Sequence, residues 1–319
     1  MLRVLEAFAG VGTTRMALER VLPCEHVGII ENEAMKIKAY EACHGETTIW
    51  KDIRDVDQYR LPDHDLFTYS FPCTDLSKEG KGEGFDGKKS SLLFECERII
   101  ACKRPKYLLC ENVPQLFTKK NEEGFLKWLD ILEMLGYKNY CFKLKGCDYG
   151  VPQNRERAFI VSFLGGGEFK IPEKKQMVRI VEYLTSYYIK SLPKMNDKGM
   201  MFKESGKVYV KEAVVAGHTH VNNWDTVNLA FPTSKTRRGR VGRQMAQTLL
   251  KSHEMGIWTG KDLRRIDGVT SLMLMGIDER YIYKLHQSGF SDSQMKQIAG
   301  DAIVVDVLEA IFKEMFKNF

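Results

Sequence analysis

The stretch Leu2-Arg-Val-Leu-Glu-Ala-Phe-Ala-Gly-Val-Gly12 decides the fold of this chain. A short, mainly apolar run leads into two glycines separated by one residue, and an amphipathic stretch follows at 14–21. Glycine adopts the positive φ angles of a tight turn and lets a ligand approach the backbone closely. We therefore predict a strand over residues 2–8, a glycine turn and a helix, which form the first half of a βαβ unit.

The same alternation of apolar runs and amphipathic stretches continues to about residue 165. It predicts further strands at 27–31, 65–70, 107–113, 140–145 and 158–164, and helices at 33–43, 92–102 and 124–135. Strands that alternate with helices of this length form a parallel sheet covered on both faces. The predicted fold class is therefore α/β, with a doubly wound, mostly parallel sheet.

A second, smaller domain interrupts this pattern. Three consecutive glycines at 165–167 end the alternation, and the periodicity stays weak from 166 to 261. Regular order returns at 263–275, and 301–316 predicts an apolar-periodic helix that packs back on the first domain. We expect a large domain at 1–165 and 278–319 and a small domain at 166–277.

The interrupting segment is basic. Residues 166–261 contain 17 Lys and Arg against 8 Asp and Glu, although the whole chain of 319 residues has a net charge of only +6. A basic segment inside an otherwise mildly acidic protein is typical of a face that binds a polyanion. A solvated, lysine-rich surface is the alternative interpretation.

Composition argues against several other classes of protein. No run of about 18 apolar residues occurs, so we expect no membrane span. The N-terminal run contains Glu6 and lacks an A-x-A cleavage pattern, which favours a strand over a signal peptide. The eight cysteines form no C-x-x-C pair and no zinc-finger spacing with histidine, so we expect no disulfide framework and no metal. We expect a cytoplasmic protein, because free thiols suit that reducing compartment, and a monomer.

Acidic residues follow two of the predicted strands. Glu31 ends the second strand, about 20 residues after the glycine turn, where a carboxylate accepts hydrogen bonds from ribose hydroxyls. Glu33 is close enough to be confused with it. Asp52-Ile53 follows a third strand and presents a carboxylate to an adenine amino group. Each acid taken singly is more simply interpreted as a surface charge, but their common placement after successive strands favours a nucleoside-containing cofactor. NAD stays open at this point, because the G-x-G pattern lacks its third glycine.

Two reactive side chains are predicted at neighbouring strand ends. The fourth strand runs into Pro72-Cys73, and the next ends in Glu111-Asn112-Val113. Carboxyl ends of parallel strands share one edge of the sheet, so Cys73 and Glu111 are expected on the rim that binds the cofactor. Gln153-Asn-Arg-Glu-Arg157 is expected at the turn of the following hairpin. A buried core thiol, a loop-capping carboxylate and phosphate-binding arginines are the alternative interpretations.

These motifs, in this order and spacing, resemble those of the C5-cytosine DNA methyltransferases of bacteria and phages. The resemblance is close over 1–165 and weak at 264–277 and 297–305. It implies S-adenosylmethionine as cofactor and double-stranded DNA as partner. The implied cofactor-binding residues are Phe8, Gly10, Gly12, Glu31, Asp52, Ile53, Pro72, Asp301 and Ala302.

The resemblance also implies a covalent mechanism. The Cys73 thiolate adds to C6 of cytosine and gives C5 carbanion character. Glu111, kept protonated by a desolvated pocket, relieves charge at N3 and contacts the 4-amino group. Arg157 holds the O2 edge, and Arg155 organises the loop. Because a duplex buries the ring in its stack, the target nucleotide must be extruded.

In this family, the segment that corresponds to the basic segment recognises the target DNA sequence. Residues 236–243 contain four arginines with interleaved glycines, and arginine is the usual bidentate partner of guanine as well as a phosphate ligand. The glycine- and lysine-rich stretch 74–91 is expected to act as a phosphate-seeking lid. The implied DNA contacts are Ser77, Lys89, Arg237, Arg238, Arg240, Arg243 and Thr248.

Several positions depart from the family pattern without removing a group that the chemistry needs. Thr13 replaces a glycine, Thr74 the glutamine after Pro-Cys, Lys89 an arginine and Asp301 an asparagine. The late motif at 264–276 lacks expected charged residues. Three alternatives stay open: a tRNA cytosine-5 methyltransferase, a catalytically silent DNA-binding paralogue and an NAD-dependent enzyme. The long basic insertion argues against the first, the complete motifs against the second, and the incomplete glycine fingerprint against the third.

Overall fold

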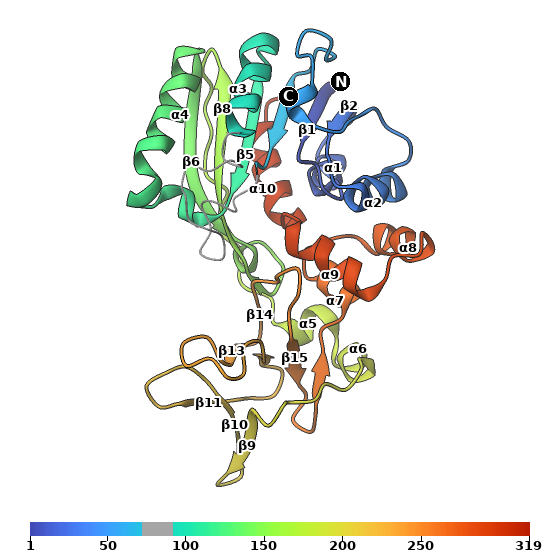
Figure 1. Cartoon of the computed structure of the whole chain (residues 1–319), viewed down its shortest axis with the longest axis vertical. Coiled ribbons are helices and arrows are strands. Elements are labelled where there is room, and N and C mark those ends of the chain that lie inside the picture. The colour runs from blue at the N-terminus through green and yellow to red at the C-terminus, as the bar shows by residue number, and fades with distance from the viewer. Residues whose placement is uncertain (72–91) are drawn as a thin grey trace. The chain divides into compact units, whose positions relative to one another are not determined.

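The structure of the chain is a computed structural model that describes residues 1–71 and 92–319 (Figure 1). It divides into two compact units. The first unit comprises Met1–Leu144, Glu156–Glu173 and Val307–Phe319, and the second comprises Lys145–Arg155 and Lys174–Asp306. Compared with the predicted boundaries, the second unit also takes in Lys145–Arg155 and all of residues 278–306, whereas residues 166–173 belong to the first unit.

A seven-stranded sheet forms the centre of the first unit, in the order β3-β2-β1-β4-β5-β8-β6. Neighbouring strands from β3 to β5 are parallel, and β8 runs antiparallel to β5. The predicted α/β fold with a doubly wound, mostly parallel sheet is confirmed. The strands are β1 (Leu2–Ala7), β2 (Cys24–Ile30), β3 (Ile49–Trp50), β4 (Leu66–Tyr69), β5 (Tyr107–Asn112), β6 (Tyr137–Lys145) and β8 (Glu156–Leu164).

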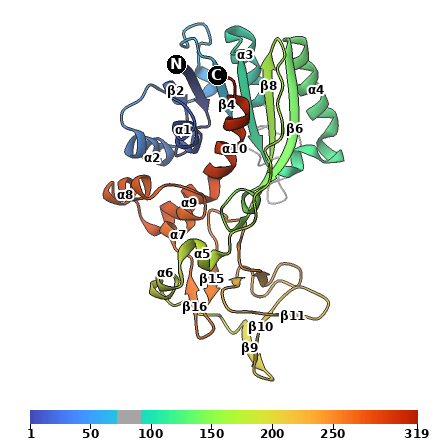
Figure 2. The same ribbon diagram turned by 180° about the vertical axis from the view of Figure 1, so that it is seen from behind.

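Helices cover this sheet. They are α1 (Thr13–Glu19), α2 (Ala34–His44), α3 (Leu92–Lys103), α4 (Glu122–Met134) and α10 (Val305–Met315). Figures 1 and 2 both show α1 and α2 beside β1 and β2, and α4 beside β6 and β8. The core joins sheet residues to α3 and α4, and the Tyr69 and Trp128 rings meet edge-on at 6.1 Å. Strands β4 and β5 are almost wholly buried, as expected for parallel strands covered on both faces.

The predicted C-terminal helix starts later than expected. Asp301 is the last residue of α9 (Asp292–Asp301), and α10 begins at Val305. The two helices are separated because Ala302 adopts an extended conformation, with φ −64° and ψ 155°. The predicted packing of this segment is confirmed by the Phe316 ring, which meets Tyr107 of β5 at 5.1 Å.

The second unit is built from short strands. The four-stranded sheet β13-β12-β15-β16 and the three-stranded sheet β11-β10-β9 enclose a small core that includes Val210, Val227 and Trp258. Because these strands have three to five residues, the sequence shows little periodicity here. They are β9 (Met201–Glu204), β10 (Lys207–Lys211), β11 (His218–His220), β12 (Thr226–Asn228), β13 (Arg240–Gly242), β15 (Met255–Trp258) and β16 (Leu263–Arg265).

Helices complete the second unit. They are α5 (Ile180–Leu184), α6 (Ser186–Ser191), α7 (Gly268–Met273), α8 (Glu279–Gln287) and α9. The segment between β6 and β8 is the predicted hairpin connection, since the two strands are neighbours in the sheet and the backbone N–H of Gly146 donates to the carbonyl oxygen of Arg155 at 3.0 Å, but it belongs to this unit instead of the first. Its short strand β7 (Gln153–Asn154) pairs in parallel with β14 (Ala246–Gln247). Buried hydrogen bonds of Gln153 with residues of this unit account for the difference.

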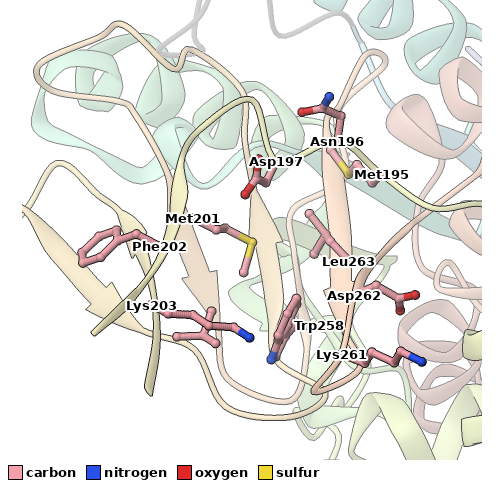
Figure 3. Close-up of a pocket in the computed structure, with 11 residues that line it drawn as sticks. Met195, Asn196, Asp197, Met201, Phe202, Lys203, Trp258, Lys261, Asp262 and Leu263 are labelled. Atoms are coloured by element: carbon pink, nitrogen blue, oxygen red, sulfur yellow. The ribbon is translucent and has the colours of Figure 1, made fainter. Parts of the chain in front are cut away.

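A pocket of about 570 Å³ lies between the two larger sheets of the second unit. Figure 3 shows Met201, Trp258 and Leu263 converging on it from β9, β15 and β16. Two carboxylates and two lysines complete its lining, so its charges balance. None of the residues predicted to act in catalysis, cofactor binding or DNA binding lines this pocket.

Candidate active site

The turn after β1 depends on its two glycines for different reasons. Gly10 and Gly12 both have positive φ, at 59° and 80°. A Cβ on Gly12 would lie 2.5 Å from Nε2 of His44 and 2.7 Å from Cε2 of Tyr40, both on α2. A Cβ on Gly10 would meet no atom within 4 Å. Gly12 therefore permits packing against α2, whereas Gly10 leaves the backbone open on one side.

Glu31 connects this turn to the end of β2. Its carboxylate is buried, and Oε2 accepts a hydrogen bond from the backbone N–H of Gly10 at 3.0 Å. Oε1 accepts from the backbone N–H groups of Asn32 and Glu33, each at 3.0 Å. The neighbouring Glu33 side chain is exposed and paired with Lys36. The structure thus brings together the predicted Gly10 and Glu31 and separates Glu31 from the acid with which it could be confused.

Asp52 and Ile53 follow β3, as predicted. The Asp52 carboxylate caps a short 3₁₀ turn and accepts hydrogen bonds from the backbone N–H and the Nε of Arg54, both at 3.0 Å. The side-chain hydrogen bond from Arg54 holds the pKa of the Asp52 carboxyl below its ordinary value. Ile53 is buried in the core of the first unit. Sequence reasoning missed Arg54, because nothing in the local pattern marks it as a partner of Asp52.

Glu111 and Arg157 form an ion pair at the end of β5. Nε of Arg157 lies 3.1 Å from Oε1 of Glu111, and both side chains are largely buried, with 16% and 11% of their surface exposed. The antiparallel β5–β8 ladder, in which Glu111 pairs with Phe159, holds the two side chains in register. Two charged groups predicted to act on one substrate ring are therefore adjacent.

Asn112 has a contact that the sequence did not reveal. Its side-chain amide donates a hydrogen bond to the carbonyl oxygen of Phe71 at 3.2 Å and is buried. Its Oδ1 accepts from the backbone N–H of Val113 at 2.8 Å. Asn112 therefore ties the end of β5 to Phe71, the second residue after β4. Pro72, Cys73, Ser77, Lys89 and the predicted lid at 74–91 lie outside the described residues.

Arg155 belongs to the second unit and is buried there. Its Nη1 donates to the carbonyl oxygen of Leu249 at 3.0 Å, and its Nη2 donates to that of Gly300 at 2.9 Å. Gln153 is also buried and donates to the carbonyl oxygen of Leu274 at 2.7 Å. The first two side chains of the Gln-x-Arg-x-Arg motif therefore join distant segments of the second unit, whereas Arg157 belongs to the first.

The predicted cofactor contacts near the C-terminus also lie in the second unit. Asp301 is exposed and pairs with Lys251, whose Nζ lies 2.8 Å from Oδ2. Ala302 is buried. Phe8, the remaining predicted contact, adopts a positive φ of 58° directly after β1 and packs against the core of the first unit.

The predicted DNA-binding arginines differ in their surroundings. Arg237 and Arg240 are exposed, and the Arg237 guanidinium lies 5.2 Å from the centre of the Phe231 ring. Arg243 instead donates from Nη1 to Oδ2 of the buried Asp225 at 2.5 Å. Arg243 therefore has an internal partner that the sequence did not reveal.

Two further candidates for DNA binding also make internal contacts. The carbonyl oxygen of Arg238 accepts a hydrogen bond from the backbone N–H of Ala213 at 3.0 Å. The Thr248 hydroxyl donates to the carbonyl oxygen of Asn154 at 2.8 Å. Both residues therefore help to hold separate segments of the second unit together.

Two classes of feature are absent from the part of the chain that the structure describes. No helix of residues 1–71 and 92–319 has the length and apolar character needed to cross a bilayer. Within the same residues, no group of three or more histidine, cysteine, aspartate or glutamate side chains could hold a metal ion.

The sheet order, the glycine turn and the buried acid after β2 define a doubly wound α/β protein with a ligand site at the carboxyl ends of its strands. Residues 2–317 match the family of C-5 cytosine-specific DNA methylases. The chain is 32% identical to the type II methyltransferase M2.ScrFI of Lactococcus lactis subsp. cremoris over 100% of both chains. It is 28% identical to the type II methyltransferase M.NlaX of Neisseria lactamica, over 99% of this chain and 96% of that one.

Solved structures share the fold. The methyltransferase EhMeth of Entamoeba histolytica superposes with a TM-score of 0.71 at 16% identity, over 100% of this chain and 98% of that one. The chain therefore belongs to the C-5 cytosine-specific DNA methylase family, and it is an enzyme that transfers a methyl group to carbon 5 of cytosine in DNA.

Proposed function

We propose that this enzyme uses S-adenosylmethionine to methylate cytosine in duplex DNA, through a covalent bond between Cys73 and an extruded base. The contact between Glu111 and Arg157 carries the proposal, because it gathers a carboxyl group and a guanidinium at the end of β5. Asn112 supports it by tying Phe71, two residues before Cys73, to the same strand end.

The residues of the first unit fit the cofactor. The open side of Gly10 allows a ligand to approach the backbone, and the Glu31 carboxylate lies at that turn. A carboxylate has about four acceptor positions, so three backbone N–H bonds leave Glu31 the capacity for a ribose hydroxyl. Asp52 and Ile53 would bound the adenine, with Phe8 and Pro72 as further contacts. The other two proposed contacts, Asp301 and Ala302, belong to the second unit. When bound, the cofactor supplies a methyl group activated on a sulfonium sulfur.

The chemistry then follows from the side chains of this chain. Addition of the Cys73 thiolate to C6 moves electrons toward N3 and O2 of the ring and makes C5 nucleophilic. Glu111 holds a proton at N3 and Arg157 donates to O2, and the ring nitrogen and the exocyclic oxygen lie side by side on one edge of the base, which matches the adjacent side chains. After methyl transfer, loss of the C5 proton restores the ring and expels Cys73.

The Glu111–Arg157 ion pair has to separate before this mechanism can operate. A nearby guanidinium favours the ionised form of a carboxyl group, so Arg157 opposes the protonated Glu111 that the reaction needs. Entry of cytosine between the two groups would take Arg157 to O2 and free Glu111 to accept a proton for N3. For Arg155 we propose a positioning role within the second unit instead of contact with the base, because its guanidinium donates to two backbone carbonyls.

We propose that residues 166–277 read the target and that 1–165 and 278–319 catalyse the reaction. The exposed Arg237 and Arg240 suit contact with guanine edges or phosphates. Arg238, Arg243 and Thr248 would support the reading segment, since each has an internal contact. Ser77 and Lys89 are proposed phosphate contacts. The enzyme would act as a monomer in the cytoplasm, which size-exclusion chromatography and cell fractionation test.

The decisive experiment traps the covalent intermediate. The enzyme is incubated with S-adenosylmethionine and duplexes of mixed sequence that contain 5-fluorocytosine, in which fluorine blocks the loss that releases Cys73. We expect a denaturation-resistant adduct that maps to Cys73 and is absent from Cys73→Ser. Labelled tRNA that also contains 5-fluorocytosine serves as the competing substrate. An adduct with tRNA alone, or none with either nucleic acid, contradicts the proposal.

A further inference from the structure

A cysteine, a histidine and a glutamate form a chain of contacts in the first unit, outside the proposed active site. Cys24 Sγ lies 3.2 Å from Nε2 of His26, and Nδ1 of the same ring lies 3.1 Å from Oε1 of Glu6. Cys24 and His26 are two residues apart on β2 and so share one face of the sheet, and Glu6 comes from the neighbouring β1. Methyl transfer as proposed uses none of these three groups.

This order of groups is the one that activates a nucleophile. An imidazole in contact with a sulfur accepts or shares its proton, and a carboxylate on the opposite ring nitrogen orients the imidazole and stabilises its charge. His26 and Glu6 have 3% and 1% of their side chains exposed, so solvent does not compete for their contact. Cys24 is partly exposed, so a small reagent can reach the sulfur.

Charge in the cluster favours an imidazolium next to the sulfur. Burial opposes a charge on His26, but its hydrogen bonds with Cys24 and Glu6 outweigh burial and raise its pKa to about 9. At neutral pH both ring nitrogens then carry protons, one directed at Glu6 and one at Cys24. In addition, Oε2 of the buried Glu6 has no hydrogen-bond partner among the described residues, so the contacts of Glu6 with His26 and Tyr40 both fall on Oε1.

The helices packed near the cluster bring the charged side chain of Arg15, which lies 6.0 Å from the centre of the Tyr40 ring. From α2, Tyr40 donates its hydroxyl to Oε1 of Glu6 at 3.0 Å, and burial raises its pKa well above the ordinary value. His44 is neutral, because burial and then Arg15 lower its pKa to about 4. From α1, Arg15 pairs with Glu19 at 3.0 Å. The Glu6–His26 pair is therefore the charged centre beside Cys24.

We propose that Cys24 is an activated thiol and a site of covalent modification by small disulfides and soft electrophiles, separate from methyl transfer. Cys24 begins β2 and Ile30 ends it, so about 20 Å of strand separates the sulfur from the cofactor end of the sheet. A reaction at Cys24 therefore does not require access to the proposed cofactor site.

A disulfide reagent would react with Cys24 by thiol–disulfide exchange. The Cys24 thiolate attacks one sulfur of the reagent, a new S–S bond forms, and the original S–S bond breaks. The released thiolate takes the proton from Nε2 of His26. The imidazole becomes neutral and keeps its Nδ1–H bond to Glu6. No other oxidant is needed, because the disulfide itself is reduced.

The test compares two thiols in the same folded protein. Full-length Cys73→Ser is treated with iodoacetamide at pH 6.5, and modification is followed on the tryptic peptides 21–36 and 139–143, which contain Cys24 and Cys141 as their single cysteines. Cys141 is the control, since it is exposed and burial raises its pKa to about 11. Because the thiolate is the nucleophile, we expect Cys24 to react at least about tenfold faster.

Two variants locate the cause. His26→Gln is expected to slow Cys24 about tenfold at pH 6.5 and to leave Cys141 unchanged. Tyr40→Phe keeps the sulfur–imidazole contact and should leave the Cys24 rate within about twofold. Oxidised glutathione should give a mixed disulfide on peptide 21–36. Two results would overturn the proposal. One is a Cys24 rate at or below that of Cys141 while His26 and Glu6 are unsubstituted. The other is an unchanged Cys24 rate in a folded His26→Gln protein.

Discussion

The end of β5 and the arginine segment at 236–243 are both rich in charge, but they are built in opposite ways. Glu111 and Arg157 lie on neighbouring strands whose ladder holds their side chains 3.1 Å apart. The arginines of 236–243 lie on a loop and a three-residue strand, and Arg243 is held by a buried aspartate. Bond-making chemistry requires groups placed to a fraction of an ångström, which a sheet ladder provides, whereas exposed loop arginines can adapt to a groove.

The largest expected effect is at Glu111. Glu111→Gln removes the group that holds a proton at N3, so the rate constant for methylation under single turnover should fall by roughly a hundredfold to ten-thousandfold. Duplex affinity should change little. Glu33→Gln is the matched control, because Glu33 is an exposed acid beside the same sheet. A Glu111→Gln enzyme that keeps more than a tenth of the normal methylation rate would contradict the catalytic role that we assign to Glu111.

Alanine substitutions at the two glycines of the turn after β1 test how tightly the first unit is packed there. Alanine at either position carries a cost of about 1–2 kcal/mol for its positive φ. Gly12→Ala also forces Tyr40 and His44 of α2 to move, so its free energy of unfolding should fall by about 3 kcal/mol. Gly10→Ala should cost only the backbone term. Urea unfolding of both variants measures the difference, and equal losses would contradict the packing assigned to Gly12.

The two arginines of the Gln-x-Arg-x-Arg motif should respond differently to the same change. Arg155→Lys loses one of two buried carbonyl contacts, so the free energy of unfolding should fall by about 1–3 kcal/mol. Arg157→Lys keeps a positive charge beside Glu111 and should cost less than about 1 kcal/mol. Its methylation rate should nevertheless fall about tenfold or more. Urea unfolding and single-turnover rates together test both roles. A large loss of stability in Arg157→Lys, with a large loss of rate in Arg155→Lys, would contradict the structural role of Arg155 and the catalytic role of Arg157.

The smallest effect is expected at an exposed arginine of the recognition segment. Arg240→Ala should reduce the slope of log affinity against log salt concentration by about 0.9 and leave stability unchanged. Arg243→Ala should instead destabilise the protein, because it removes the partner of Asp225, which is 1% exposed. Binding titrations at several salt concentrations, with thermal unfolding alongside, separate the two. An unchanged salt slope in Arg240→Ala would place that residue away from DNA.

The amino-acid sequence alone determined where strands follow one another along the chain and which residues lie at their ends. Apolar runs separated by amphipathic stretches allow only a few topologies, and parallel strands place their carboxyl ends on one edge. Gly10, Glu31 and Glu111 could therefore be assigned to that edge before any side chain was located.

Only the tertiary structure decided which partner each side chain takes. Asn112 reaches Phe71 across 41 residues, Arg155 reaches Gly300 across 145, and Arg157, two residues away, pairs with Glu111 in the other unit. The Cys24–His26–Glu6 contacts likewise depend on how β1 and β2 pair. Periodicity reports which face of an element is buried, but a hydrogen bond requires two atoms within about 3 Å, and the folded chain alone brings them that close.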